Sequence, residues 1–472
     1  MSMRYPAGIV TASYFPLKVP NAPTIGTATS SSPTSVSVTF TAPSNVGGGA
    51  ITSYVATARK TSDGTTVSGT GSSSPVTISG LTTNSAYTVT VAAVNAFGAG
   101  PSSAASNSVT PLEQQLWAWG VNSYGQLGLG NTTQYSSPKQ VGALIDWAAN
   151  TVTSAGGHTL AVKTNGTLWS WGRNGVGQLG SGTTGPASYR SSPVQVGALS
   201  TWLRVSAGYE HSLAIRTDGT LWSWGGNNKG QLGLGNTTSY SSPKQVGALT
   251  NWADVSGSPS SGQPFSLALK TNGTIWSWGD NQTYGQLGLG NLTDYSSPKQ
   301  IGALTTWASI SAGNSFVMAT TTSGALYAWG RNDFGQVGLG NTTYYSSPKQ
   351  VGALTNWLRV TAGRYHTLAV KTDGTLWAWG QGAGGKLGLN NSTNYSSPKQ
   401  VGALTNWSRT SISPNASIAV KTDGTLWSWG SGTNGQLGLG NTNPYSSPKQ
   451  VGSLTTWQAV SMGTFSVVAI KG

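Results

Sequence analysis

The sequence predicts an all-β protein, in which a β-sandwich is followed by a seven-bladed β-propeller closed by pairing of its N- and C-terminal strands. Three observations support this prediction. Only 8% of the 472 residues are charged and 66 are glycine, a composition that favours turns and strands over helices. All 20 tryptophans lie between Trp117 and Trp457, so the chain changes character before residue 117. From there, a pattern read as W-x-W-G recurs seven times, at intervals of 50 to 54 residues.

Residues 20–111 show the pattern of the β-sandwich. Short stretches at 35–40, 53–58 and 87–94 alternate apolar and polar residues, with Gly, Ser and Thr turns between them. The phrases PNAPTIG, GLTTNSAYTVTVAAVNAFGAGPSS and SNSVTP resemble the fibronectin type III family. The resemblance implies that Leu81 and Tyr87 are its core leucine and corner tyrosine, and that Phe40 replaces its core tryptophan. Domains of that family are mostly spacers or adhesive modules, so we expect no chemistry from this one.

Residues 115–472 form the predicted propeller. One unit contains the four β-like stretches PKQVGAL, WLRVTAG, HTLAVKT and GTLWAWG (348–380), and four strands make one blade. Asn-Gly or Asp-Gly joins the last two stretches, with Ser323-Gly324 as a weak copy. We expect LWAWG (116–120) to pair with SVVAIKG (466–472) and close the ring. In the repeated phrase NTTYYSSPKQVGAL (341–354), we expect a glycine-ended crossing between blades, a proline that opens the first strand, and a valine and leucine that face the core.

The wording of the repeat resembles a known family. GQLGLGN (125–131), SAGYEHSLAIRTDGTLWSWG (206–225) and a P-x-x-V element are similar to regulator-of-chromosome-condensation repeats, whose members are seven-bladed propellers. That family includes nucleotide exchange factors, ubiquitin-ligase modules and secreted inhibitors of β-lactamase. The resemblance therefore implies a fold and leaves the function open.

The chain offers few groups for catalysis or metal binding. It has eleven acidic residues, of which only Glu113 and Glu210 are glutamates, and no cysteine. His158, His211 and His366 occupy one repeat position, so we expect them to be spread around the ring, each ordering the turn before its strand. GLGNTT is not followed by GK[ST], so it is not a phosphate loop. We therefore expect no enzyme activity, no catalytic residue, no cofactor and no metal.

Two surfaces are candidates for binding. Comparing the seven copies shows variation in the loop before GQLG and in the loop after the AG of the third element, and loops on a rigid scaffold often carry binding sites. The candidate loop residues are Arg173, Tyr209, Glu210, Tyr284, Arg331, Phe334, Arg364 and Tyr365. The second candidate is a basic ring with one residue per blade, Lys139, Lys244, Lys299, Lys349, Lys399 and Lys449, each four residues after a tyrosine. Neutral drift in the loops and a solvated rim are the alternatives.

The leading functional hypothesis is a non-enzymatic virion protein: a bacteriophage tail, fibre or capsid-decorating component that binds a host surface or neighbouring virion proteins. It depends on the low charge, the near-identical repeats and a spacer domain ahead of a propeller. It also depends on two absences, because the sequence shows no signal peptide and no apolar run of 18 residues. Residues 1–19 would anchor the chain, and the net charge of +14 would suit a host glycan or an envelope polyanion rather than nucleic acid. The alternatives are a bacterial surface or secreted inhibitor-like propeller and, third, a nucleotide exchange factor.

Overall fold

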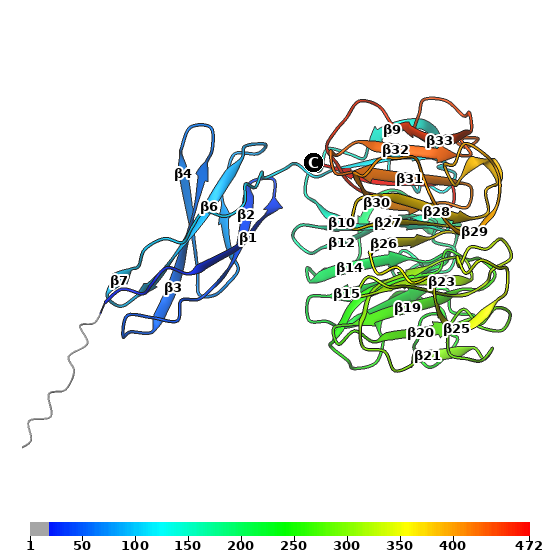
Figure 1. The fold of residues 1–472 in the computed structure, drawn as a ribbon, viewed down its shortest axis with the longest axis horizontal. Coiled ribbons are helices and arrows are strands. Elements are labelled where there is room, and N and C mark those ends of the chain that lie inside the picture. Colours follow the sequence, from blue (N-terminus) through cyan, green and yellow to red (C-terminus); the bar gives the residue numbers. More distant parts are fainter. Residues whose placement is uncertain (1–17) are drawn as a thin grey trace, which may run out of the picture. The chain divides into compact units, whose positions relative to one another are not determined.

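A computed structural model describes residues 18–472, apart from the side chain of Asn150. The expected anchoring segment, 1–19, falls almost wholly outside the described residues. The chain divides into two compact units, one that ends at Glu113 and one that runs from Gln114 to Gly472 (Figure 1). Each unit is described by itself below. None of the helical segments in the described part of the chain is long and apolar enough to cross a membrane.

The first unit is a β-sandwich of two antiparallel sheets. One sheet contains, in spatial order, β1 (Thr24–Ser32), β2 (Ser35–Thr41) and β5 (Val76–Ser79). The other contains β4 (Thr66–Gly71), β3 (Ile51–Lys60), β6 (Tyr87–Asn95) and β7 (Gly98–Ala99).

The side chains that the resemblance singled out lie in the sandwich core. Leu81 and Tyr87 are buried, and the Tyr87 hydroxyl accepts a hydrogen bond from the Thr82 N–H at 3.0 Å, which joins the corner to strand β6. The Phe40 ring packs 4.6 Å from the ring of Tyr54, between the two sheets. Phe40 therefore fills the core at the place of the missing tryptophan.

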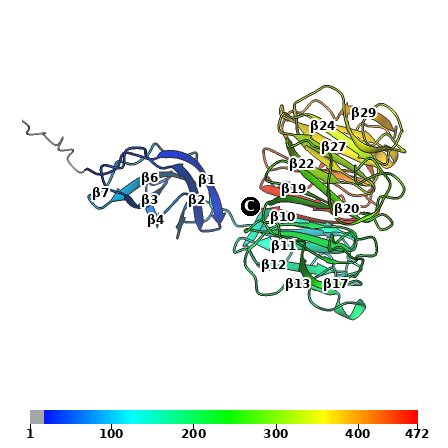
Figure 2. The ribbon, with the colours of Figure 1, turned by 90° about the horizontal axis from the view of Figure 1, so that it is seen from below.

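The second unit is a propeller of seven four-stranded antiparallel blades (Figures 1 and 2). Blade 1 contains β10 (Trp147–Ala155), β11 (His158–Lys163), β12 (Leu168–Gly172) and β13 (Arg190–Gln195), and blade 2 contains β14 (Trp202–Ala207), β15 (His211–Arg216), β16 (Leu221–Gly225) and β17 (Tyr240–Gln245). Blade 3 contains β18 (Trp252–Gly257), β19 (Phe265–Lys270), β20 (Ile275–Gly279) and β21 (Tyr295–Gln300), and blade 4 contains β22 (Trp307–Ala312), β23 (Phe316–Thr321), β24 (Leu326–Gly330) and β25 (Tyr345–Gln350). Blade 5 contains β26 (Trp357–Ala362), β27 (His366–Lys371), β28 (Leu376–Gly380) and β29 (Tyr395–Gln400), and blade 6 contains β30 (Trp407–Ile412), β31 (Ala416–Lys421), β32 (Leu426–Gly430) and β33 (Tyr445–Gln450). Blade 7 contains β34 (Trp457–Met462), β35 (Ser466–Lys471), β8 (Gln115–Gly120) and β9 (Tyr135–Gln140).

Strands from both ends of the repeat region close the ring, as predicted. Strand β35 pairs with β8, and Val468 lies opposite Ala118. The order of strands within a blade differs from the prediction, however. The YSSPKQ stretch is the outermost strand of the preceding blade, so Lys139 lies opposite Ala118 rather than opening a new blade. Pro138 stands inside this strand, not at its start, because an edge strand needs no N–H at that position.

A ring of hydroxyl groups joins the innermost strands of neighbouring blades. The Ser311 hydroxyl in blade 4 accepts a hydrogen bond from the Ala362 N–H of blade 5 at 2.9 Å. The junction that closes the ring uses the same bond, from the Ser154 N–H of blade 1 to the hydroxyl of Ser461 in blade 7. The equivalent acceptors at four other junctions of the described propeller are Thr153, Ser206, Ser256 and Ser411. In the described propeller, a backbone N–H of every blade except blade 6 thus donates a hydrogen bond to a hydroxyl of the preceding blade.

Tryptophans and the GQLG loops fill the space between blades. The indole of Trp329 is buried and donates a hydrogen bond to the Gln286 carbonyl of the preceding blade at 3.0 Å. Gly288 lies so close to this indole that a Cβ would be 2.6 Å from its nitrogen, and its φ is 74°. The GQLG loop therefore connects strands of one blade and packs on the next, whereas the chain crosses between blades at VGAL.

The VGAL crossing corrects one sequence expectation. Val351 is buried, as expected, but Leu354 is 49% exposed. The crossing turns through Gly352, where φ is 62°, so the leucine that follows points away from the blade. The other six blades repeat this exposure at Leu144, Leu199, Leu249, Leu304, Leu404 and Leu454.

Candidate functional site

The two sets of varied loops lie on one face of the propeller. Within a blade the four antiparallel strands alternate in direction, so the loop between the first and second strands and the loop between the third and fourth strands share an end. The Asp-Gly hairpins and the VGAL crossings lie at the opposite end. The first end is called the varied-loop face below, and the second the crossing face.

Arg331 is the centre of a cluster that three blades build on the varied-loop face. It begins the loop after β24 in blade 4, and its guanidinium lies 5.0 Å from the ring of Tyr284 in blade 3 and 5.1 Å from the ring of Tyr365 in blade 5. Asp333, two residues further along the loop, forms an ion pair with Arg331. A cation held between two aromatic rings is attracted to both faces. The three predicted candidates Tyr284, Arg331 and Tyr365 are thus brought together.

Three more side chains complete this Arg331 cluster. The Phe334 ring lies 5.2 Å from Tyr365, and the guanidinium of Arg364 lies 5.0 Å from the same ring. The Tyr344 ring is 45% exposed and meets Tyr284 edge to face at 5.0 Å. Its hydroxyl donates to Asp333, a hydrogen bond that raises the pKa of Tyr344 to about 12 and keeps the phenol protonated. Asp333 therefore holds Arg331 and Tyr344 in place together.

A second cluster repeats this arrangement in blades 7, 1 and 2. Arg173 occupies the position of Arg331 and lies 5.7 Å from the ring of Tyr124. Its Nη1 is 3.1 Å from a carboxylate oxygen of Glu210, which stands where Tyr365 stands in the first cluster. The Tyr189 ring meets Tyr124 edge to face at 5.7 Å. The predicted candidates Arg173 and Glu210 are therefore a pair, and this second cluster is more polar.

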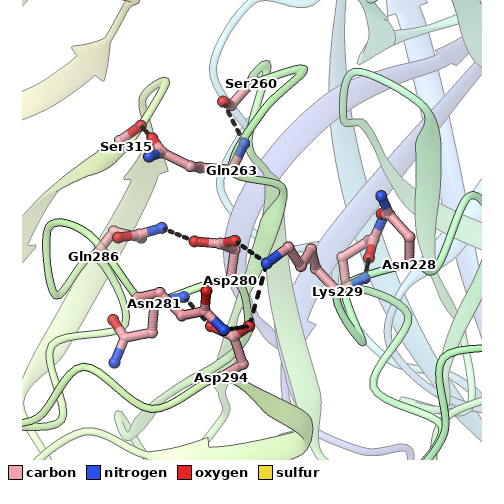
Figure 3. A network of polar contacts seen from close by, with 11 residues as sticks. Asn228, Lys229, Ser260, Gln263, Asp280, Asn281, Gln286, Asp294 and Ser315 are labelled. Carbon is pink, nitrogen blue, oxygen red and sulfur yellow. Dashed lines mark hydrogen bonds and ion pairs between the residues drawn. The ribbon is translucent and has the colours of Figure 1, made fainter.

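At the same loop position blade 3 carries the opposite charge. Asp280 replaces the arginine and is 3% exposed, and burial raises the pKa of its carboxyl. Lys229 of blade 2 reaches between two carboxylates, with its Nζ 3.1 Å from Asp280 and 3.5 Å from Asp294 (Figure 3). Gln286 donates to the other oxygen of Asp280 at 3.0 Å. The charge at this loop position therefore changes sign between the neighbouring blades 3 and 4.

A small pocket lies in the middle of this face. Its volume is about 120 Å³, and the loops between the first and second strands of several blades line it. Tyr209, Asn314, Arg364, Pro414 and Met462 contribute to the lining. Tyr209 is thus placed at the mouth of the central channel, where it is next to Glu210 in the chain and interacts electrostatically with Arg173.

Sequence reasoning missed several members of these clusters. Tyr124 and Asp333 stand in the varied loops, whereas Tyr344 and Tyr189 precede the outer strand by one residue. Loop variation could have identified Tyr124 and Asp333, because both lie in the varied loop between the W-x-W-G and GQLG elements. The opposed charges of Lys229 and Asp280 in the corresponding loops of neighbouring blades were also readable as a contact between blades.

The predicted basic ring lies elsewhere, on the outermost strands. Lys349 is exposed, and its Nζ lies 6.0 Å from the ring of Tyr345, because residues four apart on a strand share a face. Asn341 donates to the Tyr345 hydroxyl at 3.0 Å and holds the ring. The equivalent distances at Lys139, Lys244, Lys299, Lys399 and Lys449 are between 5.4 and 5.8 Å. Val194 interrupts the series in blade 1, and the lysines do not join the Arg331 cluster.

The histidines link blades. His366 Nε2 lies 2.9 Å from the hydroxyl of Ser417 in the next blade, and that hydroxyl donates to the Lys386 carbonyl at 2.7 Å. His158 and His211 make the same contact with the following blade. Burial lowers the pKa of His158 to about 3 and that of His211 to about 4, so both are neutral at pH 7. Each side chain thus bonds the next blade, and the rings of His158 and His211 also lie against Ala155 and Gly208 at the turn before their own strands.

Comparison with known proteins identifies both units. A family model described as RCC1-like domain matches residues 115–469, and one described as Fibronectin type III domain matches residues 21–109. The chain is 32% identical over 222 residues to the ultraviolet-B receptor UVR8 of Arabidopsis thaliana, and the matched segment covers 47% of this chain and 50% of UVR8. It is 31% identical over 224 residues to the E3 ubiquitin-protein ligase HERC2 of Homo sapiens, and the matched segment covers 47% of this chain and 5% of HERC2. It therefore spans half or less of these two relatives.

Solved structures show the same fold. The structure of yeast RCC1 (Prp20) bound by Kap60 has a TM-score of 0.67 at 21% identity, over 76% of this chain and 89% of that chain. Human WBSCR16 also has a TM-score of 0.67 at 21% identity, over 76% of this chain and 98% of that one. The family match extends over most of the sequence and agrees with the seven blades, so the chain belongs to the RCC1-like domain family, with a fibronectin type III domain ahead of the propeller.

Proposed function

We propose that this protein is a non-enzymatic binding protein that presents the varied-loop face of its propeller to a partner protein. The Arg331 cluster is the observation that supports the proposal. Arginine and tyrosine dominate the residues that contribute most to protein interfaces. Here two arginines and four aromatic rings from three blades are held in fixed contacts, so little side-chain freedom is lost on binding.

Relatives agree with a protein partner. Yeast RCC1 (Prp20) is solved as a complex with Kap60, and Prp20p of Saccharomyces cerevisiae is described with binding properties to Gsp1p and histones. The loops of the present chain differ from blade to blade, whereas its scaffold repeats. A surface that varies on a constant frame favours recognition of one particular partner.

We place the protein in a virus particle, as a tail, fibre or decorating component. This setting is supported by the very low charge, the near-identical repeats and the fibronectin type III domain ahead of the propeller. Mass spectrometry of purified particles should then recover the chain. Hydroxyl-radical footprinting of those particles should show protection of Tyr344, which is exposed in the isolated propeller.

The virion setting and the partner-binding role can be refuted independently of each other. If the chain is missing from the particles, the virion setting is wrong, while a partner-binding role remains open to a direct test. In that test the double variant Arg331→Ala, Tyr365→Ala should weaken partner binding by about 2 kcal/mol or more. Lys349→Ala, on the outer strand, should change it by less than about 0.5 kcal/mol. Equal effects of the two variants would refute the loop-face proposal.

The six stacked lysines support a second binding surface for an acidic glycan. Each ammonium is exposed and sits at the same register of its blade, so several weak contacts can act together. A glycan array at low and high salt tests this surface. Binding that survives replacement of all six lysines by glutamine, with unchanged salt dependence, would exclude it.

A further inference from the structure

Charged side chains gather at one level of the central channel. The innermost strands β10, β14, β18, β22, β26, β30 and β34 contact one another in a closed ring around the propeller axis. In blades 2 to 7 the third residue of this strand pairs with the same position of the second strand, so these residues share one level: Arg204, Asp254, Ser309, Arg359, Arg409 and Ala459. This set is called the axial ring below.

The axial ring carries three arginines and one aspartate. Within residues 18–472 no ion pair or side-chain hydrogen bond joins Arg204, Arg359 or Arg409 to an acid. Burial raises the pKa of the Asp254 carboxyl, and a hydrogen bond from the Val255 N–H at 3.0 Å and the charge of Arg204 oppose that shift. One level of the channel therefore holds a net charge of about +2 without a matching partner.

The arginines are close enough to repel one another. Burial lowers the pKa of Arg409 to about 10, with a further contribution from the charges of Arg359 and Arg204. At pH 7 Arg409 is still protonated, so the folded protein bears the cost of its repulsion by the neighbouring guanidinium groups. The equivalent residues of other blades, Ser309 and Ala459, show that the scaffold accepts neutral side chains here.

A cavity of about 420 Å³ lies against Asp254, Arg359 and Arg409, whereas Arg204 is not among the residues that line it. Residues of six blades line it, including Asp254, Ser309, Arg359, Arg409 and Thr410. Its volume lies within the range of roughly 300 to 1,000 Å³ that is usual for sites of small ligands. In blades 3 to 7 the lining comes from the second to fifth residues of the innermost strands, whereas the pocket on the varied-loop face begins at the sixth. The two cavities are thus distinct positions along one channel.

We propose that the axial ring binds a small polyphosphate anion in the central channel. Guanidinium groups present planar pairs of N–H donors that match phosphate oxygens, and the two that line the cavity, Arg359 and Arg409, can hold adjacent phosphoryl groups. Asp254 offsets one of the three positive charges, so the ligand must carry at least two negative charges. The hydroxyls of Ser309 and Thr410 line the same cavity, where they are hydrogen-bonded to the hydroxyls of Thr320 and Thr361. The site does not depend on the varied-loop face and goes beyond the proposed function.

Calorimetric titration of the full chain with tripolyphosphate tests the proposal. We expect one anion per chain, with an affinity that falls as salt increases. The double variant Arg359→Gln, Arg409→Gln should bind about 100-fold more weakly, at about tenfold for each arginine. Without ligand it should melt at the same or a higher temperature, because repulsion is relieved. Arg59→Gln, which changes an exposed arginine of the first unit, is the matched control and should bind as the wild type does.

A variant that should bind better separates the site from folding defects. Asp254→Asn keeps the three arginines and removes the one negative charge, so the affinity for tripolyphosphate should increase severalfold. A misfolded protein cannot produce that increase. No binding by the wild type, equal binding by the double variant, or weaker binding by Asp254→Asn would overturn the proposal. Tighter binding of a hexaglutamate peptide than of tripolyphosphate would also overturn it, by assigning the channel to an acidic peptide.

Discussion

Lys386 should make the propeller less stable at neutral pH than it would be with glutamine. Lys386 is 2% exposed and stands where the other six GQLG loops have glutamine. Its Nζ contacts only neutral oxygens, at 2.7 Å on Gln381, 3.1 Å on the Pro414 carbonyl and 3.5 Å on Asn415. Burial, with a smaller contribution from Arg364, lowers the pKa of Lys386 from 10.5 to about 8.

The size and pH range of the effect follow from this shift. A difference of about 2.5 pH units corresponds to about 3 kcal/mol, at 1.36 kcal/mol for each unit. Below pH 8 the lysine is protonated in both states, so the full cost is present. Between pH 8 and pH 10.5 the unfolded chain binds more protons than the folded one, so stability rises with pH. Above pH 10.5 the cost is gone.

The variant Lys386→Gln should therefore be more stable at pH 7, by up to about 3 kcal/mol less the value of the lost ammonium hydrogen bonds. In the sister loop of blade 4, Gln336 accepts the Phe334 N–H at 2.9 Å, so glutamine fits this loop. The advantage should shrink as the pH rises from 8 to 10.5.

Urea unfolding followed by tryptophan fluorescence measures this, because all 20 tryptophans lie in the propeller. Lys349→Gln, which changes an exposed lysine, is the control and should show no such pH dependence. An advantage of Lys386→Gln that is the same at pH 7 and at pH 10.5, or no advantage at either, would refute the reasoning.

Three further predictions concern the scaffold. The variant His211→Phe carries the residue that blades 3 and 4 have at this position. Because the pKa of buried His211 is lowered to about 4, the free energy of unfolding of the wild type should fall by up to about 3 kcal/mol between pH 6.5 and pH 4. In acid unfolding curves the variant should lose less stability over the same range. Deleting residues 464–472 removes β35, opens the ring, and should lower the melting temperature of the propeller; a melt at the wild-type temperature would contradict the closure. Ser311→Ala should cost about 1 kcal/mol in urea unfolding, because it leaves the Ala362 N–H without an acceptor, and an unchanged midpoint would count against the hydroxyl ring.

The fold was predictable to a large extent because its signals are local. The Asp373-Gly374 pair joins β27 to β28, and Gly374 has a φ of 77°, as that turn requires. The repeat period of about 50 residues indicated seven blades. The sequence did not show to which blade the YSSPKQ strand belongs, because an edge strand of six residues can pair on either side until the blade exists.

The candidate site was predictable only in part. Loop variation pointed to Tyr284, Arg331 and Tyr365, but it could not show that they touch, since they lie on three different blades. Leu354 looked like a core residue because a sequence pattern does not show the turn at Gly352. Arg359 and Arg409 were part of an ordinary strand pattern until the register placed both at one level of the channel.

The sequence by itself determined the number of blades, their hairpins and the pairing of the two ends, because hydrophobic periodicity and glycine turns act over a few residues. Only the tertiary structure decided which side chains from different blades meet. Residues about 50 positions apart become neighbours when the ring closes, and their contacts then depend on strand register and loop geometry. The Arg331 cluster and the axial ring both arise in this way, so each is a property of the closed propeller rather than of any one repeat.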